Sequence, residues 1–291
     1  MTDDALSIRR AAAAELPALW ALTLRTDAHA APPAPGACGP DLAHLYTSAE
    51  LFVACRGAQI LGFVGVARRD RTAFITDLFV DPAAQSSGIG KRLLRHALAP
   101  HHGTRRFTLS SADPRALALY VRQGLQPLTP QLHLRLGRLR GAQASPRLVA
   151  LLGRGDDPAL LDWDARCGGR SRPADLRYWL EAERGVLLWL RRGASVVGYA
   201  LVRLQRPGQP GATVGPLGVL DAADAADAVQ VALGVALERA AEARLMLDGA
   251  HPALQRLLEH GAHITGHDML MSDGPLPFDG ARYVASGDSL F

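Results

Sequence analysis

A short segment with little side-chain bulk separates an apolar stretch from a helical pattern, and its residues could bind an anion. The segment comprises Gln85, Ser86, Ser87, Gly88, Ile89, Gly90 and Lys91. The first amides of a helix have no acceptor within the helix and lie at the positive end of its dipole. Glycines leave such amides open to close approach, and serine hydroxyls and a lysine add donors and charge. The segment therefore predicts a phosphate-binding turn; a strand-to-helix turn that binds nothing is the alternative.

The elements on either side must position this turn. Before it, residues 74–80 (FITDLFV) form an aromatic and apolar run that Asp81-Pro82 ends, because proline has no amide to continue a ladder. After it, apolar residues recur at helical spacing from Ile89 to Leu98, with basic residues on the other face. The pattern predicts a strand, a turn and a helix.

One carboxylate lies inside the predicted strand. Asp77 stands among Phe, Ile, Thr, Leu and Val, where aspartate is disfavoured and loss of solvent raises a carboxyl pKa. Such a group suits the role of a general base. An exposed aspartate, or one paired with an arginine, is the alternative. Glu50 and His29 are weaker candidates for the same role.

The combination of a strand, Val-Asp-Pro and the letters QSSGIG resembles the acetyl-CoA loop of the GNAT acetyltransferase superfamily, whose pattern is Q/R-x-x-G-x-G/A. The resemblance implies acetyl-CoA as co-substrate, with its diphosphate on residues 85–91. It also implies that the backbone of Leu78, Phe79 and Val80 binds the pantetheine arm. The main-chain amide of Val80 would then stabilise the oxyanion.

A second segment carries the same resemblance. Residues 113–125 match the family's N-x-x-A-x-x-L-Y-x-x-x-G-F signature, with Asp113 in place of asparagine and Leu125 in place of phenylalanine. Tyr120 retains the tyrosine, which the resemblance makes the general acid that protonates the coenzyme A sulfur; a core tyrosine is the alternative. The resemblance counts Asp113 with the cofactor-binding residues.

Composition limits the other classes of function. The chain has 291 residues, a formal charge of +4 and 48% apolar residues, and no apolar run is long enough to span a membrane. The amino terminus does not read as a signal peptide, so we expect a cytoplasmic protein, and the Ala, Arg, Gly and Leu usage suggests a bacterial one. Three dispersed cysteines lack metal-ligand spacing, so no metal is expected. The sequence has no basic run interleaved with aromatic residues, so nucleic-acid binding is not expected.

The second half of the chain repeats the first. Residues 51–67 align without a gap on residues 187–203, and the hairpin glycines 57 and 62 fall on 193 and 198. We expect an α/β (α+β) protein of two tandem GNAT-like domains, each a mixed, mostly antiparallel central sheet flanked by helices. The expected domains are residues 1–138 and 147–291, with a linker at 139–146.

The second copy lacks the chemistry of the first. Leu257 aligns with Tyr120, and the letters DAADAADAVQ replace the glycine loop. We expect Asp221, Asp224 and Asp227 to repel a diphosphate, since like charges close together cost on the order of 1 kcal/mol each. Only the amino-terminal copy should bind coenzyme A.

These features predict an acetyl-CoA-dependent N-acetyltransferase. The expected reaction is direct attack of a primary amine in a ternary complex, and the expected acceptor is a small molecule. A protein N-acetyltransferase and a non-catalytic acyl-CoA sensor are the alternatives. Neither nucleic acid nor a membrane is expected as a partner, and a homodimer is left open.

Overall fold

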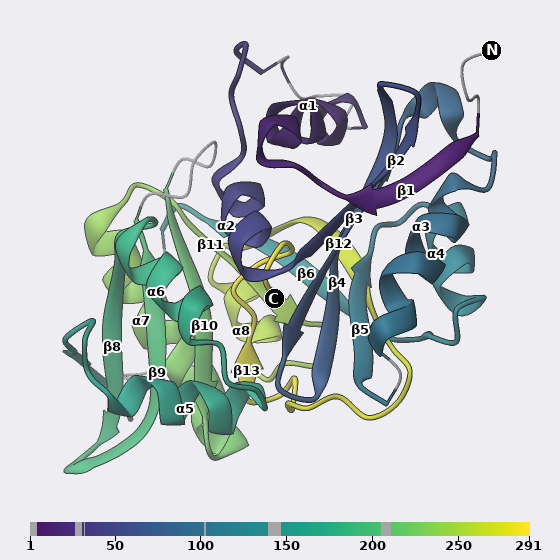
Figure 1. Ribbon diagram of the computed structural model, residues 1–291. Coiled ribbons are helices and arrows are strands. Elements are labelled where there is room, and N and C mark those ends of the chain that lie inside the picture. The colour runs from purple at the N-terminus through teal and green to yellow at the C-terminus, as the bar shows by residue number, and fades with distance from the viewer. Residues whose placement is uncertain (1–4, 27–30, 32, 102, 139–146, 205–210) are drawn as a thin grey trace.

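One mixed sheet runs through the molecule, and helices cover both of its faces (Figure 1). The computed structural model describes residues 5–26, 31, 33–101, 103–138, 147–204 and 211–291. The expected linker, residues 139–146, lies outside the described residues. Among the described residues, no helix has the length and apolar character needed to cross a membrane.

The amino-terminal half has ten helices and strands within its described part. In chain order they are β1 (Leu6–Arg10), α1 (Leu16–Arg25), α2 (Pro40–Ser48), β2 (Glu50–Arg56), β3 (Gln59–Arg69), β4 (Thr72–Val80), α3 (Ile89–Leu98), β5 (Arg105–Ser110), α4 (Pro114–Val121) and β6 (Gln126–Leu136).

The described part of the carboxy-terminal half repeats this order. Its elements are β7 (Val149–Leu152), α5 (Ala159–Gly168), α6 (Pro173–Glu181), β8 (Gly185–Arg192), β9 (Ser195–Arg203), β10 (Ala212–Val219), α7 (Ala225–Arg239), β11 (Ala243–Asp248), α8 (Leu254–Glu259) and β12 (His263–Ser272), followed by the short β13 (Tyr283–Val284). The internal repeat inferred from the hairpin glycines therefore extends to every element from β1 to β12.

The last strand of each half lies beside the other half. The strand order is β1-β2-β3-β4-β5-β12-β6-β11-β10-β9-β8-β7, so β12 separates β5 from β6, and β6 pairs with β11. If each strand is replaced by its counterpart in the other half, the same order results, read from the opposite edge of the sheet. The centre of this symmetry lies between β12 and β6. The β4–β5 and β10–β11 pairs are parallel and the other pairs are antiparallel.

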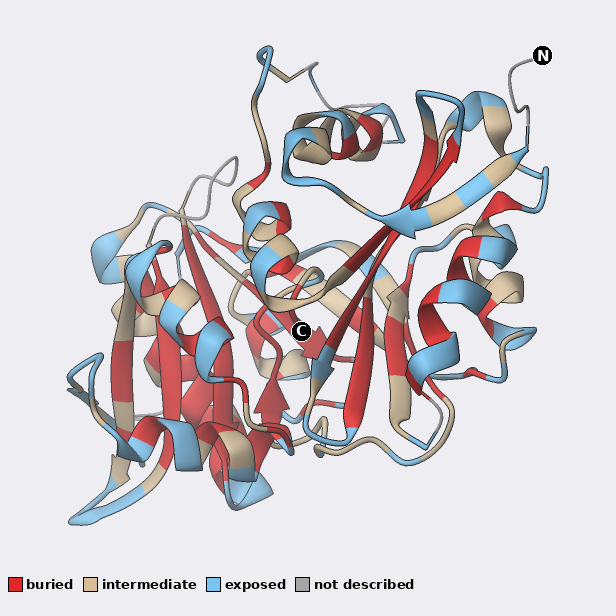
Figure 2. Cartoon of the chain, viewed as in Figure 1, coloured by how far each residue is buried: buried red, intermediate tan, exposed pale blue. Residues whose placement is uncertain are grey.

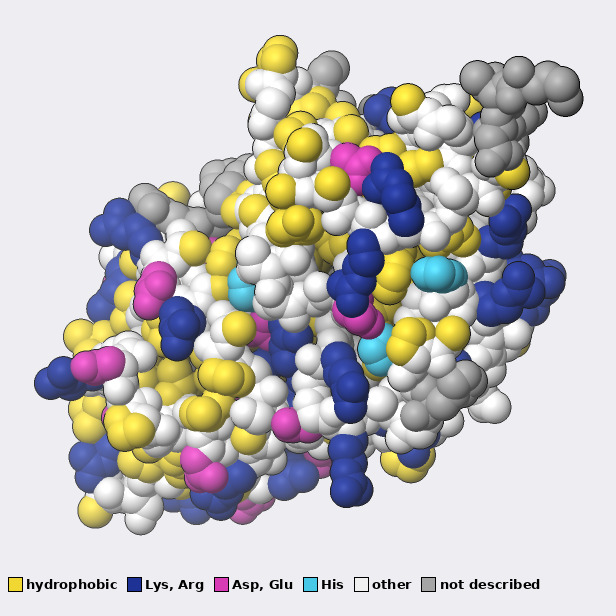
Figure 3. All heavy atoms as spheres, viewed as in Figure 1, with side chains coloured by type: hydrophobic (Ala, Val, Ile, Leu, Met, Phe, Trp, Pro, Cys, Tyr) yellow, Lys and Arg dark blue, Asp and Glu magenta, His cyan; other side chains and the backbone are white. Residues whose placement is uncertain are grey.

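On one face of the sheet, called the shared face below, a single apolar core extends over both halves. On the other face each half has its own apolar core (Figure 2). Residues of α1, α2, α5 and α6 join one apolar cluster that runs across both halves and includes Phe107, Met246 and Phe291. On the opposite face, α3 and α4 pack on the first half of the sheet, and α7 and α8 pack on the second. In Figure 3, apolar side chains also gather at the surface over α1 and α2.

A buried ionic group joins the halves on the shared face. Asp175 of α6 accepts from His44 of α2 at 2.8 Å and from Arg69 of β3 at 2.6 and 2.8 Å. Burial alone would raise the pKa of Asp175, but its bonds to His44 and Arg69 hold the pKa well below its usual value. The two halves are thus tied by charge as well as by the exchanged strands.

Candidate active site

A bulge in β4 opens the sheet beside β5. Val64 pairs with Leu78 and Val66 pairs with Ile75, so Thr76 and Asp77 together lie opposite Gly65. A Cβ on Gly65 would come within 2.2 Å of the Thr76 hydroxyl, which is why glycine is required there. The parallel register of β4 and β5 ends at Ile75 and Thr108, and the two strands separate beyond it.

The separated strands border a cleft of about 680 Å³. Its walls are the second half of β4, the turn before α3, the end of β5 and the exposed side of α4. Of the residues expected to act or to bind cofactor, those that line it are Asp77, Leu78, Phe79, Val80, Gln85, Ser86, Gly88, Ile89, Gly90, Lys91, Asp113 and Tyr120. Ser87 is not among the lining residues.

The turn before α3 presents its backbone to this cleft. Gly88 has φ +84° and no atom within 4 Å of the position of a Cβ, so the space above its amide is open. The first helical hydrogen bond runs from the Arg92 amide to the Gly88 carbonyl, at 3.1 Å, which leaves the preceding amides of the first turn for another acceptor. The Ser87 hydroxyl donates instead to the Ala84 carbonyl at 2.5 Å. This arrangement suits a diphosphate.

Asp113 begins α4 at the opposite wall. Its carboxylate accepts from the Arg115 amide at 2.8 Å and forms an ion pair with the Arg115 guanidinium at 2.7 Å. These bonds lower the pKa of Asp113. The negative charge that distinguishes it from asparagine is therefore matched by a neighbouring cation.

Asp77 has the most perturbed carboxyl of the cleft. Burial raises the pKa of Asp77 to about 7, and the nearby charges of Asp288 and Asp41 add to the effect. A hydrogen bond from the Thr76 hydroxyl at 2.8 Å opposes it. A carboxyl with this pKa is partly ionised at neutral pH and can accept a proton from an amine.

Tyr120 lies on α4 and lines the same cleft. Burial raises the pKa of Tyr120 to about 12, a hydrogen bond with Thr108 opposes the rise, and the charge of Asp77 adds to it. The phenol therefore keeps its proton at neutral pH. The structure brings a proton acceptor and a proton donor to one cleft, from β4 and α4.

The weaker base candidates differ in their surroundings. Glu50 is hydrogen-bonded to Arg10 and, at 2.8 Å, to His101, and it is not a lining residue of the cleft. His29 lies outside the described residues. Among the described residues, no group of three or more His, Cys, Asp or Glu side chains could hold a metal ion.

The second copy keeps the bulge but not its side chains. Ala200 pairs with Leu217 and Val202 with Val214, so Gly215 and Pro216 occupy the positions of Thr76 and Asp77. Leu257, at the position of Tyr120, is buried in the core against α7. The second copy thus has neither ionisable group at these two positions.

The space beside β10 is filled by the chain itself. After the register of β10 with β11 ends at Thr213 and Arg244, β13 pairs with β10 at Leu217–Val284 and Gly218–Tyr283. Ala285 also bridges to Met246 of β11. Residues 283–285 occupy the gap that corresponds to the open part of the first copy's cleft.

The structure supplies cationic partners for two of the three aspartates that we expected to repel a diphosphate. Asp224 forms an ion pair with Arg192, and Asp227 forms ion pairs with Arg147 at 3.1 Å and Arg256 at 3.0 Å. Partnered carboxylates are stable there, since each is matched by a guanidinium. The arginines could not be assigned from sequence, because they come from distant elements.

Sequence reasoning also missed Asp41, Asp288 and the bulge. Asp41 and Asp288 come from α2 and from the segment after β13, and no spacing links them to Asp77. Gly65 was the available signal for the bulge, as a glycine inside a strand often marks one.

The fold and this cleft are those expected of an acetyltransferase, and comparisons with known proteins agree with that class. Residues 18–125 match the family described as Acetyltransferase (GNAT) family. Within these residues the chain is similar to the GNAT family, whose members use acetyl-CoA as co-substrate. No curated protein sequence matches the chain.

Solved structures share the fold over nearly the whole chain. A presumed acetyltransferase from Pyrococcus horikoshii is 15% identical with a TM-score of 0.74, covering 98% of this chain and 96% of that one. A GCN5-related N-acetyltransferase from Sphaerobacter thermophilus is 15% identical with a TM-score of 0.62, covering 96% and 98%. A tandem GNAT protein from the clavulanic acid biosynthesis pathway is 18% identical with a TM-score of 0.62, covering 93% and 99%. The expected fold of two GNAT-like domains is confirmed.

Proposed function

We propose that the protein is an acetyl-CoA-dependent N-acetyltransferase that acts on the primary amine of a small molecule through its amino-terminal copy. The observation that carries the proposal is that Asp77 and Tyr120 line one cleft with the turn before α3. The open space above Gly88 is a fit for the diphosphate of coenzyme A. Bound acetyl-CoA would supply the activated acetyl group.

Asp77 would take the proton of the attacking amine. A lysine-like amine has a pKa near 10.4 and an α-amine one near 8, so both need a base at neutral pH. A carboxyl with a pKa of about 7 combines an ionised fraction with useful basicity. The amide of Val80 would stabilise the negative charge that develops on the carbonyl oxygen, and Tyr120 would offer its proton to the departing sulfur.

The second copy would act as support. Pro216 and Leu257 stand where the first copy has Asp77 and Tyr120, and β13 fills the gap beside β10. These features support a single reaction centre per chain. The residues 1–138 and 147–291 remain our proposed limits of the two copies.

The proposal is tested with the full chain. Calorimetric titration should show coenzyme A binding, and thiol release from acetyl-CoA should depend on an added amine from a panel. Coenzyme A binding without thiol release in the presence of any class of amine would favour an acyl-CoA sensor. Thiol release only with peptide amines would favour a protein acetyltransferase. Absence of coenzyme A binding would refute the proposal.

A further inference from the structure

We propose that a pocket at the seam of the two halves binds the acceptor, and that the acceptor is an amine that also carries a carboxylate or a phosphate. The seam pocket is defined by His133, Arg135, Thr213, Arg244, Ser286 and Asp288, and has a volume of about 310 Å³. The inference rests on the proposed acetyltransferase function. The pocket is large enough for a compound of the size of an amino acid or a sugar phosphate.

The seam pocket lies on the shared face of the sheet. Leu134 and Leu136 of β6 pack against the α7 side, so His133 and Arg135, which alternate with them, lie on the other side. Met246, which also lines the pocket, belongs to the apolar cluster of the shared face. Strand exchange creates this place, because it sets β6 beside β11.

One side of the pocket is cationic. Arg135 and Arg244 both contact Glu242, at 3.5 and 2.9 Å. Two guanidiniums for one carboxylate leave positive charge for a ligand. Arginine binds carboxylate and phosphate groups in a bidentate manner, which gives geometric selectivity.

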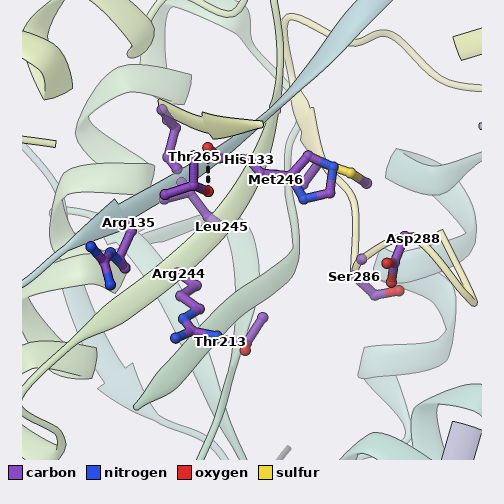
Figure 4. A pocket seen from close by; sticks show the side chains of 11 residues that line it. His133, Arg135, Thr213, Arg244, Leu245, Met246, Thr265, Ser286 and Asp288 are labelled. Carbon is purple, nitrogen blue, oxygen red and sulfur yellow. Dashed lines mark hydrogen bonds between the residues drawn. The ribbon is translucent and has the colours of Figure 1, made fainter. Parts of the chain in front are cut away.

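The opposite side is acidic and polar. Figure 4 shows Ser286 and Asp288 across the pocket from Arg135 and Arg244. Ser286 is 2% exposed, and its hydroxyl has no hydrogen-bond partner among the described residues. Ser286 therefore belongs to the packed wall of the pocket. The ring of His133 is held by Asp268 at 2.9 Å.

Asp288 connects this pocket to the reaction centre. It lines the pocket, and its negative charge adds to the rise in the pKa of Asp77 that burial mainly causes. A ligand with its acid group on Arg135 and Arg244 would extend its ammonium group toward Asp288, and from there toward Asp77. The charge arrangement fits a zwitterion and does not fit a plain polyamine.

Two matched pairs of amines test the inference on the full chain. L-lysine is compared with 1,5-diaminopentane, and glucosamine 6-phosphate with glucosamine, by thiol release and by calorimetry. We expect at least one acid-bearing amine to exceed its partner about tenfold in kcat/KM, which corresponds to about 1.4 kcal/mol. The pair that shows the preference distinguishes carboxylate from phosphate.

Variants assign the preference to the pocket. Arg244→Gln should bring the ratio within each pair close to 1, mainly through KM of the acid-bearing amine. Arg135→Gln should raise the same KM, and Arg166→Gln, on the exposed side of α5, should change nothing.

The two proposals fail separately. Acid-bearing amines that bind in the wild type but not in Arg244→Gln, with no acetylation, would support the pocket and refute the reaction. Acetylation that is equal within both pairs and unchanged in Arg244→Gln would refute the pocket and leave the reaction standing. If neither acid-bearing amine binds or reacts better than its partner, the pocket would also be refuted.

Discussion

The carboxyl of Asp77, at a β-bulge, should make the proposed reaction depend on pH. Asp77 has a pKa of about 7 because loss of solvent raises it, and the charges of Asp288 and Asp41 add to the rise. If it is the general base, kcat/KM should rise with pH to about 7 and then level off. Asp77→Asn should lower kcat/KM by about 10² or more and remove this inflection. A pH profile of thiol release measures both. If Asp77→Asn keeps the inflection near pH 7, another group is the general base.

The same substitution should affect stability in the opposite direction. Below pH 4 the carboxyl is protonated in both states, and between 4 and 7 the folded state binds more protons than the unfolded one. Stability therefore falls as pH rises through this range, and the whole penalty is present above 7. We expect Asp77→Asn to be more stable than the wild type at pH 8 by on the order of 1 to 4 kcal/mol, and by much less at pH 4. Urea unfolding at the two pH values measures the difference.

Tyr120 should matter for turnover rather than for cofactor binding. Its pKa of about 12 keeps the phenol protonated, so it can stabilise the departing sulfur. Tyr120→Phe should lower kcat by about 10² and leave the dissociation constant of coenzyme A nearly unchanged. Tyr46→Phe on α2 is the control for loss of a tyrosine hydroxyl. If Tyr120→Phe retains full turnover, the tyrosine is a core residue with no catalytic role.

At the scale of elements, the turn before α3 can be tested by adding bulk. Gly88 has φ +84° and open space at its Cβ position, so a valine there would strain the backbone and fill the anion site. We expect Gly88→Val to weaken coenzyme A binding at least tenfold, or about 1.4 kcal/mol, in calorimetric titration.

Gly103 provides a control for backbone strain alone. It has φ +82°, nothing within 4 Å of its Cβ position, and does not line the cleft. Gly103→Val should therefore lower stability to a similar extent without weakening coenzyme A binding. If the Gly88 and Gly103 variants bind coenzyme A with equal affinity, the turn before α3 is not part of the cofactor site.

Local patterns predicted the elements around the cleft well. The strand that ends before Pro82, the helix from Ile89 to Leu98 and the hairpin at Gly57 depend on neighbouring residues, and each is present. The first long helix, α1, begins at Leu16, and a 3₁₀ turn at Ala13–Glu15 precedes it.

Features that depend on distant segments could not be predicted. The pairing of β6 with β11 could not be predicted, because the apolar face of the last strand of one copy fits either half of a symmetric sheet. The same holds for Asp288, which comes close to Asp77 only through the path of the chain after β12. The turn and Asp77 could be selected from sequence, whereas the groups that set the pKa of Asp77 could not.

At the scale of the whole molecule, the exchanged strands should make folding of the two halves interdependent. Without β12, β5 would lose its antiparallel neighbour, and without β6, β11 would lose its own. An unpaired internal strand is an exposed edge that promotes aggregation. The ionic group of Asp175, His44 and Arg69 would also be divided, leaving buried charge without a partner.

We therefore expect fragments 1–138 and 147–291 to be unfolded or aggregated when each is refolded alone. Refolded together at equal concentration, they should form a one-to-one complex that binds coenzyme A, because each supplies the strand that the other lacks. Circular dichroism and sedimentation measure both outcomes, and a full chain cleaved at a protease site placed within 139–146 is the control for chain scission. A monomeric fragment 1–138 that unfolds cooperatively and binds coenzyme A would show that the first copy completes its sheet without β12, and that the exchange observed here adds nothing to its stability.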